Sequence, residues 1–177
     1  MGGLRLADRS DIPDLTALIG LSARGLSREW YTAGQTEALI REVFGVDTQL
    51  LEDQTYYLIE EKGQIVACGG WSHRRALFGG DQTKNDTDSE LDPAVDPARI
   101  RAFFVHPAAA RQGLGRRLLE HCENEARRAG FSRCELMATL PGVPFYRRAG
   151  YRELKRVSYP LRGADPVEFV RMDRSLT

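Results

Sequence analysis

Hydrophobic residues recur along the chain with two spacings, one typical of helices and the other typical of strands. Apolar positions three or four residues apart predict helices over residues 11–24, 35–44 and 113–130, and a shorter one over 144–149. Apolar or alternating runs predict strands over residues 4–7, 55–60, 64–72, 99–106, 133–139, 151–159 and 167–173. Because these elements interleave without an internal repeat, the sequence predicts one α/β domain with a mixed sheet.

A polar segment interrupts this pattern at residues 79–97, with the sequence GGDQTKNDTDSELDPAVDP. It is rich in turn-forming and acidic residues and looks too polar to build a core, so we expect a long acidic loop. Loops of this length inside a compact domain are often functional or disordered.

Length and composition limit the class of protein. The 177 residues suit one domain, and 42% hydrophobic with 28% charged residues is typical of a globular protein. No run reaches the roughly 20 apolar residues of a membrane span, so no membrane association is expected. Cys68, Cys122 and Cys134 are odd in number and lack CxxC spacing. We therefore expect reduced thiols in the core of a cytoplasmic protein, and no metal site.

Charge is balanced overall but unevenly distributed. Residues 99–162 hold 14 Lys and Arg against 5 Asp and Glu, and the rest of the chain holds 11 against 20. One interpretation is that arginine-rich helix faces are simply solvated. The other is an anionic cofactor on the basic side and a cationic substrate on the acidic side. A neutral chain without a basic stripe interleaved with aromatics does not indicate nucleic-acid binding.

The segment Ile100–Ala129 carries the strongest chemical signal. It combines an apolar strand, a turn, two glycines at Gly113 and Gly115, and a long amphipathic helix. Free N–H groups at a helix N-terminus and the helix dipole both favour a phosphate there, and glycine lets the backbone approach it closely. Arg111, Arg116 and Arg117 add positive charge around the turn.

Two nucleotide-binding motifs with similar glycines fit this segment poorly. A dinucleotide-binding fold would place its first glycine directly after the strand, whereas seven residues separate Val105 from Gly113. Glu135 has the spacing of a ribose-binding acid but begins its strand instead of ending it. The absence of a following Gly-Lys-Ser/Thr excludes a triphosphate-binding loop. A tight helix entry without any ligand stays open.

Two linked motifs resemble the GNAT superfamily of acyl-CoA N-acyltransferases. FFVHPAAARQGLGRRLL is similar to its pyrophosphate-binding motif R/Q-x-x-G-x-G/A, with Ala110 in the first position. CELMATLPGVPFYRRAGY is similar to its next element, a strand and a short helix with a Tyr just before Gly-Tyr. The resemblance implies a single N-acetyltransferase domain over residues 1–177, with a mixed, mostly antiparallel sheet flanked by helices.

The resemblance also implies site residues. The backbone of Phe103, Phe104 and Val105 would pair with the pantetheine arm of the cofactor. Backbone amides would hold its pyrophosphate at Arg111, Gln112, Gly113, Leu114, Gly115 and Arg116. Tyr146 would be the catalytic acid that protonates the departing thiolate, and a backbone N–H of the strand carrying Val105 would stabilise the oxyanion.

The implied reaction is acetyl transfer from acetyl-CoA to a primary amine of a small molecule or peptide, by direct attack and without a metal. Since nothing marks a Cys-His pair, a covalent acyl-enzyme is not expected. The alternative is a non-catalytic acyl-CoA-binding regulatory module on the same fold. A homodimer is a further possibility from the resemblance.

The general base and the acceptor site are less defined. Glu135, His73 and His106 are candidate bases, and a water chain is the alternative. Acceptor contacts are expected from residues 21–44 and from the acidic loop. Its carboxylates would either attract a cationic amine or only be solvated: Asp81, Asp86, Asp88, Glu90, Asp92 and Asp96.

Overall fold

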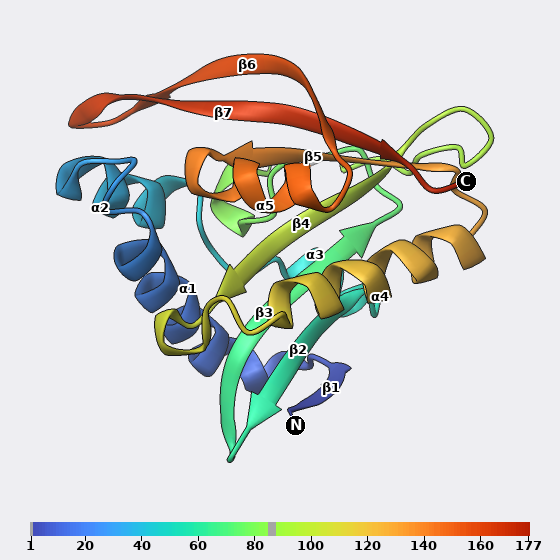
Figure 1. Ribbon diagram of the computed structural model, residues 1–177, viewed down its shortest axis with the longest axis horizontal. Coiled ribbons are helices and arrows are strands. Elements are labelled where there is room, and N and C mark those ends of the chain that lie inside the picture. The colour runs from blue at the N-terminus through green and yellow to red at the C-terminus, as the bar shows by residue number, and fades with distance from the viewer. Residues whose placement is uncertain (1, 85–87) are drawn as a thin grey trace.

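A sheet of seven strands forms the centre of the molecule in the computed structural model, which describes residues 2–84 and 88–177 (Figure 1). The strands are β1 (Gly3–Leu6), β2 (Tyr56–Glu61), β3 (Gln64–Ser72), β4 (Ala98–Val105), β5 (Arg133–Thr139), β6 (Arg152–Leu161) and β7 (Ala164–Ser175). Their order is β1-β2-β3-β4-β5-β7-β6, and every neighbouring pair is antiparallel except β4 and β5. The predicted α/β class with a mixed, mostly antiparallel sheet is confirmed.

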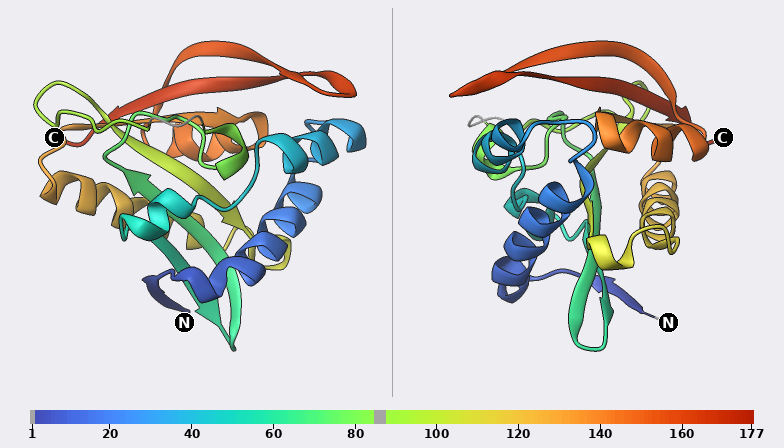
Figure 2. Two further views of the ribbon diagram at one scale, coloured as in Figure 1. Left: turned by 180° about the vertical axis from the view of Figure 1, so that it is seen from behind. Right: turned by 60° about the vertical axis from the view of Figure 1, so that its left-hand side comes forward.

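Helices cover both faces of this sheet. They are α1 (Ile12–Leu26), α2 (Ala33–Glu42), α3 (Thr48–Glu52), α4 (Leu114–Arg128) and α5 (Val143–Arg148). Helices α1, α2 and α3 lie on one face, and α4 and α5 lie on the other (Figure 2). The sheet is therefore the middle of three layers. Where two of its strands separate, the two helical layers become connected.

Local sequence explains how these helices begin and which faces they bury. The Thr32 hydroxyl accepts from the Gln35 amide while the Gln35 side chain accepts from the Thr32 amide, which caps α2 reciprocally. On α4, Leu118, Cys122 and Ala126 form the buried stripe that packs on the sheet. The three cysteines are buried and unpaired, as expected. Among the described residues no helix is both long and apolar enough to span a bilayer.

Two segments differ from the sequence prediction. The short helix α3 was not predicted, because five residues are too few to show a period. The β6–β7 hairpin is longer than expected: it continues past Pro160, where the register shifts between Tyr159 and Leu161. A bulge accommodates the proline that otherwise would have ended the strand.

The acidic segment is less separate from the core than its composition suggested. Leu91 is buried in the main hydrophobic cluster, and Glu90 forms an isolated β-bridge with Arg74. The Asp88 carboxylate accepts from the fully buried guanidinium of Arg101 at 2.9 Å and from the Ala76 amide at 2.8 Å. The expectation that this segment is too polar to contribute to the core is therefore wrong at Asp88 and Leu91. Asp86 lies outside the described residues.

Candidate active site

The parallel strands β4 and β5 pair only at Ala98–Cys134 and Arg99–Glu135. Beyond Arg99 the two strands diverge, so the remaining length of β4 has an edge without a strand partner. A cleft of about 990 Å³ opens there and is lined by residues from both helical layers. The divergence of the strands thus connects the α1 and α2 face of the sheet with the α4 and α5 face.

A buried ion-pair cluster lies where the strands part. The Glu135 carboxylate accepts from the Arg99 guanidinium at 2.9 Å and also from Arg171 of β7. Burial lowers the pKa of Arg99, and the Glu135 charge opposes that shift. Glu135 is not among the residues that line the cleft. The structure therefore does not support Glu135 as the general base, and its contacts are those of a residue that joins β4, β5 and β7.

Replacing Glu135 by glutamine is expected to lower the free energy of unfolding by about 2 kcal/mol, because a buried charge-assisted hydrogen bond is lost and Arg99 stays buried. Urea unfolding measures this change. Glu153→Gln is the matched control, since Glu153 pairs with the exposed Arg147 and should cost less than about 1 kcal/mol. Equal losses in the two variants would contradict a structural role for the buried cluster.

The edge of β4 that faces the cleft is shaped by a β-bulge. The register with β3 shifts between Cys68 and Gly70, and Ala102 adopts a left-handed φ of 59°. The His106 amide donates to the Val66 carbonyl of β3. Because backbone groups alternate along a strand, Phe104 faces β3, while Phe103 and Val105 face the open edge.

The structure therefore separates the three strand residues assigned to the cofactor. Phe103 and Val105 pack with the cluster under α4, whereas Phe104 packs with residues of the α1 and α2 face, its ring 5.5 Å from that of Phe44. The Val105 amide donates to the Ser22 hydroxyl at 3.3 Å. Of the two amides at the open edge, that of Phe103 is thus the better candidate for an oxyanion donor.

The turn before α4 presents a row of backbone amides. Gly113 is the N-cap of α4 with a left-handed φ of 81° and no side-chain cap, and Arg111 has a φ of 63°. The first intrahelical bond runs from the Arg117 amide to the Gly113 carbonyl. Within the described chain the amides from Arg111 to Arg116 have no acceptor. Such a row of N–H groups at a helix N-terminus is a site for an anion.

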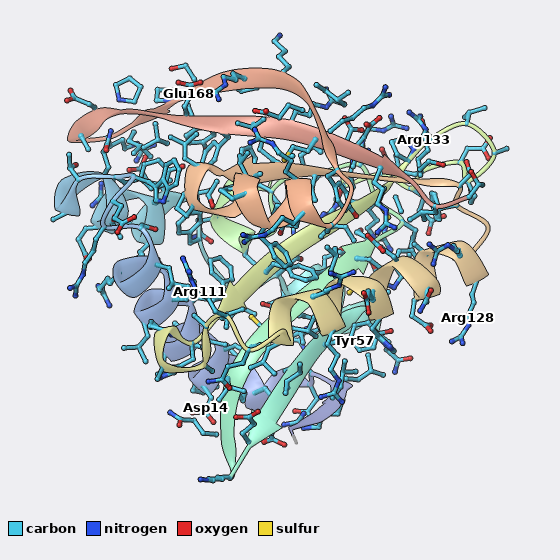
Figure 3. All side chains as sticks on the ribbon, in the orientation of Figure 1. Asp14, Tyr57, Arg111, Arg128, Arg133 and Glu168 are labelled. Atoms are coloured by element: carbon cyan, nitrogen blue, oxygen red, sulfur yellow. The ribbon has the colours of Figure 1, made fainter. Side chains whose placement is uncertain are left out.

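Basic side chains surround this row of amides. Arg111, Arg116 and Arg148 line the cleft, and Arg111 lies beside the turn that leads into α4 (Figure 3). Arg116 pairs with Glu120 one helical turn away. Arg117, by contrast, donates to the carbonyl of Gly2 at 2.6 Å and does not line the cleft. The positive charge around the turn therefore comes from Arg111 and Arg116, as predicted, and from Arg148, but not from Arg117.

Tyr146 of α5 lies in the cleft wall on the same face as α4. Its ring packs against those of Phe145 and Tyr151, with centroids 5.0 and 5.7 Å away. Its hydroxyl has no hydrogen-bond partner among the described residues. Burial raises the pKa of the Tyr146 phenol well above its ordinary value of 10.0. The phenol is therefore protonated at neutral pH and free to donate.

The two histidines considered as bases lie elsewhere. His73 is 3.7 Å from the Asp53 carboxylate and 3.8 Å from that of Glu90. The His106 Nδ1 accepts from the Ala108 amide at 3.1 Å and so caps the turn after β4. Neither residue lines the cleft.

Among the described residues of the acidic loop, no carboxylate lines the cleft. Besides the Asp88–Arg101 pair, Asp81 accepts from the Thr48 amide at 2.9 Å, and Asp96 accepts from the Asp92 amide at 2.9 Å. The contacts of Asp81 and Asp88 hold the loop to the domain, and that of Asp96 closes a turn within the loop. The expectation that Asp81 and Asp88 attract a cationic amine is not supported.

The cleft lining on the α1 and α2 face was foreseen in part. Leu26–Trp30, which runs from the end of α1 toward α2, and Phe44 lie within the range 21–44 expected to contact the acceptor, and Gly79 and Gly80 begin the acidic loop. Sequence reasoning missed Leu77, Phe78 and Met137, which also line the cleft. Only their apolar type was visible in the sequence, and apolar residues usually indicate core.

Comparison with known proteins identifies the family of the chain and other proteins with the same fold. A profile of the Acetyltransferase (GNAT) family matches residues 22–151. No curated protein sequence matches the chain. A GCN5-related N-acetyltransferase from Rhodopseudomonas palustris has a similar structure, with a TM-score of 0.73, 17% identity and 99% and 96% of the two chains covered.

Two further solved structures were determined with a cofactor. The PaiA N-acetyltransferase of Thermoplasma acidophilum, in complex with coenzyme A, has a TM-score of 0.67, 14% identity and 99% coverage of both chains. The putative acetyltransferase YncA of Salmonella typhimurium, with acetyl-CoA, has a TM-score of 0.64, 17% identity and 100% and 95% coverage. The family profile and the common fold agree, and the chain belongs to the GNAT acetyltransferase family.

Proposed function

We propose that the protein is an N-acetyltransferase that moves an acetyl group from acetyl-CoA to a primary amine of a small molecule or peptide. One observation carries this proposal. The open edge of β4 lies between the row of backbone amides at Arg111–Arg116 and the phenol of Tyr146. Neither the amides nor the phenol has a hydrogen-bond partner among the described residues. These are the groups needed at the two ends of an extended thioester cofactor.

The residues at the turn fit the diphosphate of coenzyme A. The amides of Arg111–Arg116 provide donors, the α4 dipole favours negative charge, and Arg111, Arg116 and Arg148 add positive charge. The pantetheine arm carries amides and can add to the free edge of a sheet, where Phe103 presents its backbone groups and Val105 its carbonyl. The two cofactor-bound relatives support this assignment for the fold.

The reaction on this arrangement is direct transfer. The amine nitrogen attacks the thioester carbonyl carbon, and the oxygen takes the charge, stabilised by the Phe103 amide. As the carbon–sulfur bond breaks, Tyr146 donates its proton to the leaving thiolate. The proton lost by the amine returns to the Tyr146 oxygen through water. The products are an N-acetyl amine and the free thiol of coenzyme A.

A second candidate is a non-catalytic acyl-CoA-binding module. The positions of Glu135, His73 and His106 outside the cleft favour it, because none of them can take a proton from the amine there. It shares the cofactor site and differs only in turnover, so the same experiment separates the two candidates.

Calorimetric titration of the full chain with acetyl-CoA is the test, with NADH and ATP as controls. We expect saturable binding of acetyl-CoA alone, and release of free thiol when a panel of primary amines is added. Binding without thiol release supports the non-catalytic module. Failure to bind acetyl-CoA, or equal binding of NADH, contradicts both candidates.

A further inference from the structure

The part of the cleft on the α1 and α2 face has an aromatic and apolar wall. It is formed by Trp30, Phe44, Leu77, Phe78, Phe104 and Met137. Phe44 is packed edge-on against Phe104, and Phe78 lies edge-on to Phe169 of β7 with centroids 5.2 Å apart. Phe44 and Phe169 are buried, whereas Phe78, Phe104 and Met137 are only partly buried. The wall is therefore the exposed surface of a core cluster and has fixed support behind it.

Trp30 extends this wall to the rim. Its side chain is 47% exposed, yet its backbone is firmly held. The amides of Trp30 and Tyr31 both donate to the Ser27 carbonyl at 2.9 Å. The Tyr31 hydroxyl donates to the Glu168 carbonyl at 3.0 Å and accepts from the Leu140 amide at 2.9 Å. A large exposed ring on an anchored segment suits contact with a bound molecule more than it suits solvent.

Phe78 is held beside the bulge of β4. A Cβ at Gly79 would lie 3.0 Å from the Ala102 Cβ, and one at Gly80 would lie 2.2 Å from the Val43 carbonyl oxygen. The segment therefore packs tightly on β4 at Gly79, and at Gly80 it lies too close to the end of α2 for a side chain. Arg101 fixes its other end by donating to the Ala76 carbonyl at 2.7 Å. Phe78 thus joins the cleft wall next to the bulge of β4, with its ring packed against Tyr159 and Phe169.

Charge is distributed unevenly along the cleft. The cofactor end carries Arg111, Arg116 and Arg148, whereas the rim beside Trp30 carries both Arg28 and Glu29, the latter being the only carboxylate among the described residues that line the cleft. The acceptor rim is therefore less basic than the cofactor end and repels an ammonium group less.

Given the proposed acetyltransferase function, on which this inference rests, we propose that the acceptor is a primary amine carried on an aromatic ring or similarly large apolar group. The ring contacts Trp30, Phe78 and Phe104, and the amine points toward the bulge of β4. Aromatic contacts of this kind select the body of the acceptor, not its nitrogen.

The test compares kcat/KM for 2-phenylethylamine, n-butylamine and spermidine at saturating acetyl-CoA, following thiol release. We expect 2-phenylethylamine to exceed n-butylamine at least about tenfold. Trp30→Ser should lower kcat/KM for 2-phenylethylamine about fivefold, lower that for n-butylamine less than about twofold, and leave the Kd for acetyl-CoA unchanged. Leu154→Ser is the matched control, because Leu154 is equally exposed at 45% but lies on β6 outside the cleft.

The outcomes separate this inference from the proposed function. Thiol release at equal kcat/KM for 2-phenylethylamine and n-butylamine, or highest for spermidine, overturns the aromatic acceptor but supports the acetyltransferase. An equal fall in kcat/KM for all three amines in Trp30→Ser also overturns it. Thiol release with none of the amines, despite acetyl-CoA binding, contradicts the inference and the proposed function together.

Discussion

Replacing Tyr146 by phenylalanine is expected to lower kcat about a hundredfold or more, with the Kd for acetyl-CoA changed less than about twofold. General acid catalysis contributes about 10² to 10⁴ in rate, and phenylalanine keeps the ring but not the proton. The ring contacts of Tyr146 with Phe145 and Tyr151 do not involve its hydroxyl. Thiol release and calorimetry on the same preparation measure the two quantities separately.

The pH dependence of kcat gives an independent check. The pKa of the Tyr146 phenol is raised by burial, so the acid form that donates is the populated form below the ordinary value of 10.0. We therefore expect no loss of kcat on the alkaline side up to about pH 10 in the wild-type protein. A fall of kcat with an apparent pKa between about 7 and 9 would contradict Tyr146 as the acid.

Tyr159→Phe is the matched control for this substitution. Tyr159 is a phenol on β6 whose hydroxyl has no hydrogen bond within the described chain, and it does not line the cleft. It should keep wild-type kcat. Equal losses of kcat in the two variants would indicate a general effect on packing and not loss of an acid.

The left-handed turn that opens α4 could be predicted because its geometry is local. A helix N-terminus needs no distant partner, and the left-handed φ at Gly113 is a property of that residue alone. Tyr146 was predicted through its place in a linked motif. The mostly antiparallel sheet followed from the resemblance, since short apolar runs do not reveal the order in which strands pair.

The roles of charged residues could not be predicted in the same way. Glu135 has the right chemistry for a base, yet its partners Arg99 and Arg171 are 36 residues away in either direction. Asp88 is likewise engaged by Arg101, 13 residues later in the sequence. Whether a carboxylate is free or paired depends on tertiary contacts, so an acidic composition did not reveal that this loop is held by buried arginines.

The acceptor side was predicted only in part, through the range 21–44 that contains Trp30. Trp30, Phe78 and Phe104 belong to three separate segments, and each follows a pattern that also suits a core position. Only the divergence of β4 and β5 turns part of the core cluster into a cleft wall. A local pattern gives the apolar type of a residue but not its neighbours.

The second large effect is expected at the phosphate turn, where Gly113→Asp should weaken acetyl-CoA binding at least about a hundredfold. A carboxylate would stand beside the row of amides from Arg111 to Arg116 and repel the diphosphate by like charge. A Cβ at Gly113 meets nothing within 4 Å, so the side chain itself fits. The remaining cost is the left-handed φ of 81°, about 1 kcal/mol for a residue of this type.

Gly113→Asn separates charge from strain in this experiment. Asparagine has nearly the same shape as aspartate, tolerates the left-handed conformation at least as well, and carries no charge. Gly113→Asn should therefore retain an affinity for acetyl-CoA within about tenfold of wild type. Calorimetry at two salt concentrations should show that the affinity of Gly113→Asp partly recovers at the higher concentration. Equal, salt-independent losses in both variants would assign the effect to the backbone. Unchanged affinity in Gly113→Asp would place the cofactor's diphosphate elsewhere, since an added negative charge cannot be neutral at the end of a helix that binds a phosphate.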